Sequence, residues 1–355
     1  MNRRSLPKAD PRKRMQMADL ARLAGVSAST VSRALAGSAL ISEDTRTRIQ
    51  TLARQFNYTV NSVATDLRSG VKRTIGVVVP YEQATRQSFA DPFLHGMIGA
   101  LADALTERGY EMLLSRIDAD RLDASAALVD GGRAAGLILI GQWRHHDQLN
   151  AMAERGLPLV VWGARLPRQQ YCTVGGDNLL GGRLVAEHLL AQGRRHMIFL
   201  GDTGLPEVAQ RFRGFSQALK THGIALGGEQ RAVVPFLAES GRQSMLELID
   251  AQPALDAVFA SSDLLAMAAI SALRERGRRI PEDVAVVGYD DVELAAHFNP
   301  PLSTVRQPIA AGGALLVEHL LALLQGEVLP RAALLDTRLI VRESSHHSPR
   351  TGRTR

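Results

Sequence analysis

Short apolar runs alternate with stretches of helical periodicity from Thr74 to near the end of the chain. The runs read TIGVVVP, YEMLLS, AGLILIG and LPLVVWG, and a second series reads HMIFLG, DAVFAS and VAVVGYD. Strands that alternate with helices in this way form parallel, doubly wound sheets. Because one small sheet cannot hold so many units, the sequence predicts an α/β domain of two lobes, each built on such a sheet. A ligand cleft is expected between the lobes, at the carboxyl ends of the strands.

The chain before this region has a different pattern. Between Met15 and Phe56, apolar residues recur at helical spacing in three short bursts separated by turn signals. Gly25 is expected to end the first helix in a left-handed conformation, Ser27 to cap the second and Ser42 to open the third. The sequence therefore predicts an all-α head of three helices.

The second of these helices has two unlike faces. The apolar face consists of Val31, Ala34 and Leu35, and the small or polar face of Ala28, Ser29, Ser32 and Arg33. A glycine turn followed by a helix with small or polar outward residues is what a helix-turn-helix needs to enter the major groove of DNA. A purely structural helical hairpin is the alternative, because hairpins with a glycine turn are common.

Basic residues are concentrated at the N-terminal end. Up to Arg73 the chain has 14 Lys and Arg against 5 Asp and Glu, a net charge of +9, whereas the remainder has 28 against 31, a net charge of −3. A basic block concentrates near polyanions, so double-stranded DNA is the expected partner. A solvated basic tail is the alternative for residues 3–14, but it does not explain the patterned segment that follows.

Other features predict a cytoplasmic, nucleoid-associated protein without a membrane partner. No apolar stretch approaches the roughly 18 residues of a membrane span, and the polar start lacks the apolar core of a signal peptide. The single cysteine, Cys172, offers neither an internal disulfide nor a thiolate metal cluster. No cofactor or metal is expected. The absence of P-loop spacing, a dinucleotide fingerprint and a nucleophile elbow argues against an enzyme, and the absent signal peptide argues against a periplasmic solute-binding protein.

Several motifs occur in an order that is typical of one family. They are DLARLAGVSASTVSRAL and the segment after it up to Gly70, DNLLGGRLVAEHLL at 177–190, VVGYDD at 286–291, PPLSTVRQP at 300–308 and LIVRESS at 339–345. Through these motifs the chain resembles the lactose/galactose repressor family of bacterial transcriptional regulators. The resemblance implies a DNA-binding head, a hinge and a two-lobed domain of the periplasmic-binding-protein type.

The resemblance also implies where the domains begin and end. A basic disordered tail is expected over 1–14, the head over 15–60, the hinge helix or linker over 61–73, the effector-binding and dimerisation domain over 74–345, and a tail over 346–355. Within that domain, the first lobe is expected over about 74–175 and 306–333, and the second over about 176–305 and 334–345.

By position, the resemblance implies that Ala28, Ser29 and Arg33 face base edges. Arg33 is the strongest candidate, because a guanidinium can donate two hydrogen bonds to guanine. A phosphate contact or a solvated side chain is its alternative. Three hydroxyl residues are expected to hold phosphates or cap the helix: Ser27, Thr30 and Ser32.

In this family the hinge folds on DNA and inserts a leucine into the minor groove. The matching residue is Leu67, with Asn61 and Ala64 beside it. An apolar wedge of this kind unstacks a base step and bends the duplex. An ordinary contact with the lobe below is the alternative for Leu67, and Val60 stands where the family often has proline.

The resemblance places a sugar-like effector in the cleft. Arg211 is expected to act as a forked donor and Asp290 as an acceptor, with Trp162 and Phe236 as stacking surfaces. The alternatives are an inter-lobe salt bridge for Arg211, a helix-capping carboxylate for Asp290, and core packing for the two aromatic residues.

Four further positions belong to the expected cleft. Asp91 and Phe93 lie on the first strand-to-helix loop, at the rim. Ser262 stands where the family often has asparagine, and Gly163 where it often has an acidic residue. Because both replacements shorten or remove a polar side chain that could reach a ligand, the resemblance does not identify the ligand.

The predicted function is that of a sequence-specific repressor of carbohydrate or related catabolic genes. Effector binding is expected to change the angle between the lobes and, in a homodimer on a pseudo-palindromic operator, the affinity for DNA. The effector, the operator sequence and the target genes are left open. So is the direction of control, although release of DNA is the commoner arrangement in sugar-responsive relatives.

Overall fold

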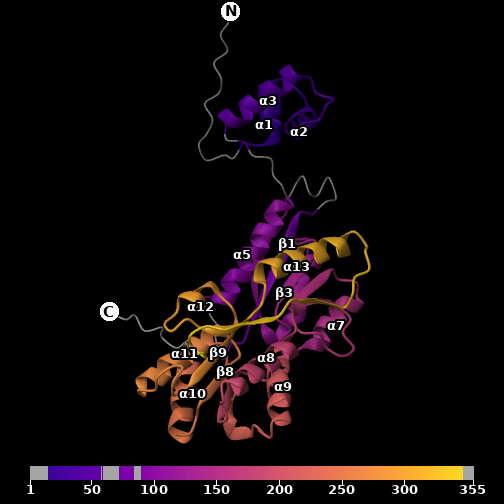
Figure 1. The fold of residues 1–355 in the computed structure, drawn as a ribbon. Coiled ribbons are helices and arrows are strands. Elements are labelled where there is room, and N and C mark those ends of the chain that lie inside the picture. The colour runs from indigo at the N-terminus through magenta and orange to yellow at the C-terminus, as the bar shows by residue number, and fades with distance from the viewer. Residues whose placement is uncertain (1–14, 57, 59–71, 84–88, 347–355) are drawn as a thin grey trace, which may run out of the picture. The chain divides into compact units, whose positions relative to one another are not determined.

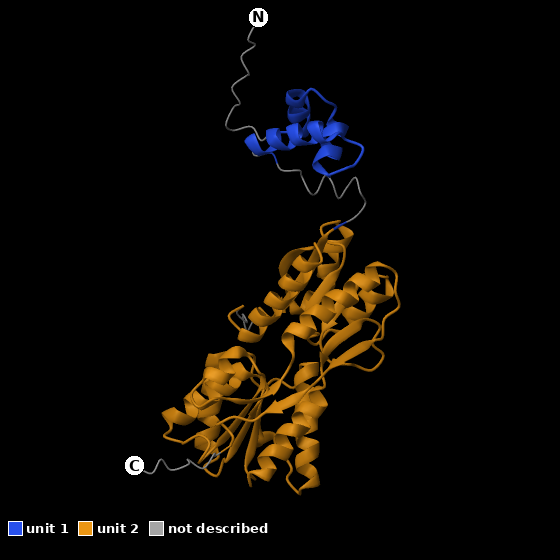
Figure 2. Cartoon of the chain, turned by 45° about the horizontal axis from the view of Figure 1, so that its top comes forward, with its two compact units in different colours: residues 1–72 blue, residues 73–355 orange. Residues whose placement is uncertain are grey.

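The computed structural model describes residues 15–56, 58, 72–83 and 89–346. The chain divides into two compact units, residues 1–72 and residues 73–355 (Figure 2). None of the helices in the described part of the chain is long and apolar enough to cross a membrane.

The first unit is a small bundle of helices. They are α1 (Met17–Ala24), α2 (Ala28–Leu35) and α3 (Glu43–Gln55). Leu20, Val31 and Ile49 are fully buried between them. Gly25 has a φ of +64°, which lets the chain turn from α1 into α2 without strain. The three-helix head and its glycine turn are confirmed.

The first lobe of the second unit is a six-stranded sheet in the order β11-β5-β4-β3-β1-β2, with every neighbouring pair parallel. The strands are β1 (Thr74–Tyr81), β2 (Glu111–Asp118), β3 (Leu137–Ile140), β4 (Leu159–Trp162), β5 (Cys172–Gly176) and β11 (Ala332–Leu335). The helices are α5 (Pro92–Glu107), α6 (Ala127–Asp130), α7 (His146–Glu154) and α13 (Ile309–Leu324), with a 3₁₀ turn at Ala119–Ala126. Helices α5 and α13 pack together over one face (Figure 1), and α7 covers the other.

The second lobe has its own six-stranded sheet in the order β12-β10-β9-β8-β6-β7. The strands are β6 (Met197–Leu200), β7 (Arg231–Ala232), β8 (Ala257–Ala260), β9 (Ala285–Asp290), β10 (Ser303–Arg306) and β12 (Arg338–Ile340). The helices are α8 (Asn178–Ala191), α9 (Pro206–Thr221), α10 (Ala238–Ala251), α11 (Asp263–Glu275) and α12 (Glu293–His297), with a 3₁₀ turn at Gly228–Gln230. Helices α8 and α9 cover one face, and α10 and α11 the other.

One edge strand departs from the expected parallel pattern. Strand β12 runs antiparallel to β10. A parallel neighbour needs a crossover connection on its own sheet, whereas the chain enters β12 directly from β11 of the first lobe. The two-lobed, doubly wound architecture is otherwise confirmed.

The chain passes between the lobes three times, after β5, after β10 and between β11 and β12. The crossing segments are joined, because Thr337 Oγ1 accepts a hydrogen bond from the Asp177 backbone N–H at 2.9 Å. A Cβ on Gly176 would lie 3.1 Å from Thr337 Oγ1 and 3.4 Å from Gln307 Oε1. The three connections therefore pack closely at one place.

Candidate DNA-binding helix and ligand cleft

Ser27 caps α2, as the sequence predicts. Its Oγ accepts a hydrogen bond from the Thr30 backbone N–H at 3.2 Å. The same oxygen lies 2.8 Å from Ser29 Oγ and 2.9 Å from Thr30 Oγ1. The first turn of α2 thus gathers hydroxyl groups at a helix N-terminus, where backbone N–H groups and the helix dipole favour phosphate.

The exposure of α2 follows its sequence pattern. Val31 and Ala34 are buried against α1 and α3, whereas Ala28, Ser29 and Arg33 are exposed. Thr30 and Ser32 are partly exposed, and the predicted hinge residues Asn61, Ala64 and Leu67 lie outside the described residues.

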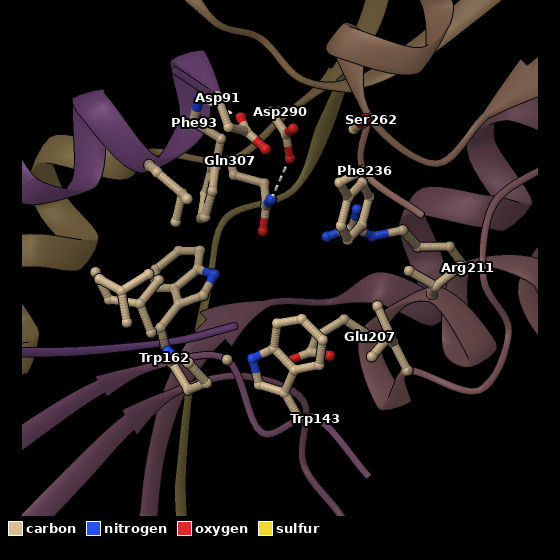
Figure 3. Close-up of a pocket in the computed structure, with 17 residues that line it drawn as sticks. Asp91, Phe93, Trp143, Trp162, Glu207, Arg211, Phe236, Ser262, Asp290 and Gln307 are labelled. Carbon is tan, nitrogen blue, oxygen red and sulfur yellow. Dashed lines mark hydrogen bonds between the residues drawn. The ribbon is translucent and has the colours of Figure 1, made fainter. Parts of the chain in front are cut away.

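A cleft opens between the two lobes of the second unit, at the carboxyl ends of their strands (Figure 3). Its empty volume is about 710 Å³, solvent at its mouth included. The seven effector-binding residues that the sequence singles out all line it: Asp91, Phe93, Trp162, Arg211, Phe236, Ser262 and Asp290.

Arg211 reaches the cleft from α9 and is held by residues of its own lobe. Its Nε donates to Asn178 Oδ1 at 2.8 Å, and its Nη1 donates to the Ser261 carbonyl at 2.5 Å. The guanidinium carbon lies 3.7 Å from the centroid of the Tyr289 ring. Because these partners all belong to the second lobe, Arg211 is a positioned donor rather than the inter-lobe salt bridge left open as its alternative.

Asp290 ends β9 with a φ of +122°, a conformation that is uncommon for residues other than glycine. Its Oδ1 accepts a hydrogen bond from Gln307 Nε2 at 2.7 Å. Burial raises the pKa of the carboxyl to about 7; the charge of Arg211 works against this shift and that of Asp91 adds to it. Since Val292 stands at the N-cap of α12, Asp290 is not the helix cap left open as its alternative.

Two residues beside Asp290 are tied to the backbone. Ser262 caps α11, with its Oγ accepting from the Leu265 N–H at 3.2 Å. Asp263 is fully buried, where its carboxylate accepts from Thr304 Oγ1 at 2.5 Å and from the Val292 N–H at 2.9 Å. Burial and the nearby Asp290 raise the pKa of Asp263 well above its ordinary value. Asp263 therefore fixes the strand end that carries Asp290.

Aromatic rings form much of the wall. Trp162 and Phe93 have ring centroids 5.9 Å apart, with the rings inclined at 46°. Trp143 and Phe236 line the cleft from the first and second lobes (Figure 3). A Cβ on Gly312 would lie 2.5 Å from the Trp162 ring, so Trp162 belongs to the core as well as to the wall. These rings offer apolar faces on which a sugar ring can stack.

Three polar or aromatic lining residues are absent from the sequence predictions: Trp143, Glu207 and Gln307. Trp143 follows the β3 run, and Gln307 lies in the PPLSTVRQP motif just after β10. Glu207 is in the first turn of α9, one helical turn before Arg211. For Trp143 and Gln307 the position just after a strand is a sequence signal, whereas Glu207 inside α9 has none.

Direct contacts join the two lobes outside the cleft lining. Arg144, which follows β3, pairs with Glu82 of its own lobe and with Asp202 of the second lobe. Gln210 of α9 also donates to the Arg165 carbonyl of the first lobe at 2.9 Å. The two lobes are therefore in direct contact through Arg144 and Gln210.

Comparisons with known proteins identify the family. A model described as "Bacterial regulatory proteins, lacI family" matches residues 16–61, and a periplasmic binding protein-like domain matches residues 186–345. The transcriptional regulator CelR of Thermobifida fusca is 35% identical over 341 residues, which cover 94% of this chain and 99% of CelR. The chain belongs to the LacI family.

Two solved LacI-family structures share its architecture. A complex of CelR with cellobiose has a TM-score of 0.69 and 34% identity, and covers 94% of this chain and 100% of that one. A Lac repressor dimer bound to operator and the anti-inducer ONPF has a TM-score of 0.83 and 25% identity, and covers 94% of this chain and 99% of that one. As a LacI-family member, this chain is a helix-turn-helix transcriptional regulator, which confirms the predicted family and class of function.

Proposed function

We propose that the chain is a repressor of carbohydrate or related catabolic genes, controlled by a sugar or sugar derivative in the cleft. The observation that carries this proposal is the convergence of Arg211 and Asp290 on one cavity with aromatic walls. A fixed donor, an acceptor and apolar ring faces are what a polyol needs from a protein site. The solved complex of CelR with cellobiose supports a sugar as the ligand.

The proposed DNA contacts start from α2. Arg33 donates to a guanine in the major groove, and Ala28 and Ser29 lie on neighbouring base edges. The hydroxyl residues contact phosphates: Ser27, Thr30 and Ser32. The proposed hinge over 61–73 contributes Asn61, Ala64 and Leu67 to the minor groove.

The working form is a homodimer in the cytoplasm, on a pseudo-palindromic operator. Two heads that read two half-sites multiply affinity, and the Lac repressor structure contains a dimer on its operator. The functional divisions are the head at 15–60, the hinge at 61–73 and the sensor at 74–345. No catalytic step is part of this function.

Control follows from linkage between two sites. A ligand that binds better to one angle between the lobes shifts the chain toward that angle. The crossing segments, joined by the hydrogen bond between Asp177 and Thr337, are where this angle changes.

Selection from a pool of random duplexes by the full-length protein tests the proposal. The expected motif has approximate two-fold symmetry, and one sugar of a panel that includes cellobiose is expected to change the affinity for the selected duplex. A motif without two-fold symmetry contradicts the dimer, and a panel in which no sugar binds to the protein contradicts the effector class.

A further inference from the structure

The cleft is lined by more acidic than basic groups. Its charged lining residues are Asp91, Glu207 and Asp290 against the single cation Arg211 (Figure 3). Charges act strongly in a cleft with low-dielectric walls, because little water remains to screen them. The sign of the lining therefore bears on which ligands can enter.

Two of the three carboxyls already hold structural partners. Asp91 caps α5, where its Oδ1 accepts from the Phe93 N–H at 2.9 Å. Asp290 accepts from Gln307 at 2.7 Å. Both groups keep acceptor capacity, but their positions are explained by the fold.

Glu207 differs from them. Its Oε1 is shielded from solvent and accepts no hydrogen bond from any described residue. Burial raises the pKa of this carboxyl, although the backbone N–H groups of Glu207 and Gln142 and the charge of Arg211 act in the opposite direction. A buried acceptor without a donor is costly, and among the described residues that line the cleft only Glu207 has such an atom.

The surroundings of Glu207 define what can meet that demand. It lies in the first turn of α9, between the apolar lining residues Leu205 and Val208 and one turn before Arg211. Trp143 and Trp162 line the same cavity from the other lobe. A ligand there stacks on aromatic rings while it presents hydrogen-bond donors to the Glu207 carboxyl.

We propose that Glu207 determines ligand specificity by accepting hydrogen bonds from hydroxyl or ammonium groups, so that the cleft takes neutral or amino sugars and excludes acidic and phosphorylated ones. An anion entering the cleft would lose its hydration and meet a single cationic group, Arg211, whose guanidinium already donates to Asn178 and to the Ser261 carbonyl. A donor-bearing ligand instead satisfies Glu207 Oε1. This inference rests on the proposed sugar-responsive function and names the ligand chemistry of the same site.

Three disaccharides of one skeleton test this selectivity. Cellobiose is neutral, its di-glucosamine counterpart carries ammonium groups, and cellobiouronic acid carries a C6 carboxylate. Calorimetry on the full-length protein near neutral pH is expected to give the uronic acid an affinity lower than that of cellobiose by about tenfold or more, and to give the amino sugar an affinity at least equal to that of cellobiose.

Two variants assign the selectivity to its residue. Glu207→Gln keeps the shape of the side chain and replaces one acceptor oxygen by an amide donor, so it is expected to weaken cellobiose binding and to reduce the penalty on the uronic acid. Glu154→Gln, the same change at an exposed position in α7, is expected to leave all three affinities unchanged. Thermal unfolding checks that both variants are folded.

Each outcome decides a different claim. Equal affinities of the wild type for cellobiose and the uronic acid overturn the exclusion of anions, whether or not Glu207→Gln folds. An unchanged ratio of these two affinities in folded Glu207→Gln overturns the role of Glu207. If neither these three sugars nor any other sugar of the panel binds while operator binding is retained, the proposed sugar effector fails, and the inference built on it fails with it.

Discussion

A Cβ on Gly163 would lie 2.6 Å from Oε1 of Gln142, so this strand end has no room for a side chain. Gln142 is fully buried, donates to the Tyr171 hydroxyl at 2.8 Å and accepts from the Ala164 N–H at 2.8 Å. Gly163 itself does not line the cleft. The Gln142 amide fills the space that an acidic side chain at position 163 would need. This explains why position 163 contributes no polar group to the cleft.

Gly163→Ala is expected to lower the free energy of unfolding by about 1–3 kcal/mol, because the new methyl group displaces a hydrogen-bonded, buried amide. Urea unfolding measures the change. Gly228→Ala is the matched control, since a Cβ at that position meets nothing within 4 Å. In the double variant with Gln142→Ala the cost should be less than the sum of the single changes, and strict additivity would contradict the clash.

Arg33→Ala is expected to weaken binding to the selected operator by about 1–3 kcal/mol, or roughly 5- to 150-fold, while sugar binding stays unchanged. The reason is the loss of a two-donor contact to guanine. Fluorescence anisotropy with a labelled operator measures it. Arg22→Ala, at an exposed arginine of α1 that pairs with Asp19, serves as the control. An equal loss on operator and on random DNA would reduce Arg33 to a phosphate contact.

The raised pKa of Asp290 predicts a pH dependence with a definite sign. Between about pH 4, where the unfolded carboxyl releases its proton, and about pH 7, where the folded one does, the native state binds more protons than the unfolded state. The stability that Asp290 contributes is therefore full below about pH 4 and is lost as the pH rises through about 7.

Asp290→Asn, which does not titrate, should accordingly gain stability relative to the wild type between pH 5 and pH 8, by an amount on the order of a few kcal/mol. Thermal unfolding at both pH values measures the gain. Asp283→Asn is the control, because the ion pair with Arg279 lowers the pKa of Asp283 to about 2 and its effect should be constant over this range. If the stability difference between Asp290→Asn and the wild type is the same at pH 5 and pH 8, the raised pKa of Asp290 is wrong.

Arg144→Ala removes the ion pairs with Glu82 of the first lobe and Asp202 of the second. Because these groups are partly exposed, the pairs contribute only about 0.2–1 kcal/mol, so effector affinity is expected to fall by less than about fivefold. The fall should shrink as salt is added. Calorimetry at low and high salt measures both effects, and a loss independent of salt would mean that Arg144 does not act through its charge.

The strands that the sequence predicts are apolar runs, and most of them are buried on both faces of a sheet, although β2, in the YEMLLS run, is only partly buried. The LILI run of β3 and the AVFA run of β8 are fully buried, and such strands are apolar throughout. Strand β5 (CTVGG) and strand β10 (STVR) have no such run, because they lead into the crossing segments, where polar side chains and glycine are needed. Their place in the sheets depends on long-range pairing that no local pattern contains.

In the site, too, some residues can be predicted from the sequence and others depend on three-dimensional packing. Arg211 in α9 and Asp290 at the end of β9 are found through the family resemblance, and the doubly wound topology brings the carboxyl ends of the strands together at the cleft. Glu207 is not found, because its role depends on which side of α9 faces the cleft and on the absence of a donor for its Oε1. The filling of position 163 by Gln142 is likewise a matter of three-dimensional packing.

The central claim is that a sugar in the cleft controls the affinity of the head for DNA. Arg211→Lys tests it, because lysine keeps the charge but loses the forked geometry and the stacking on Tyr289. The decisive measurement is the operator dissociation constant with and without the sugar that calorimetry identifies, for the wild type and for this variant. The account predicts a shift of about tenfold or more in the wild type, and in the variant a much smaller shift from an unchanged starting affinity. An equal shift in both proteins, or none in a wild type saturated with the sugar, would contradict it.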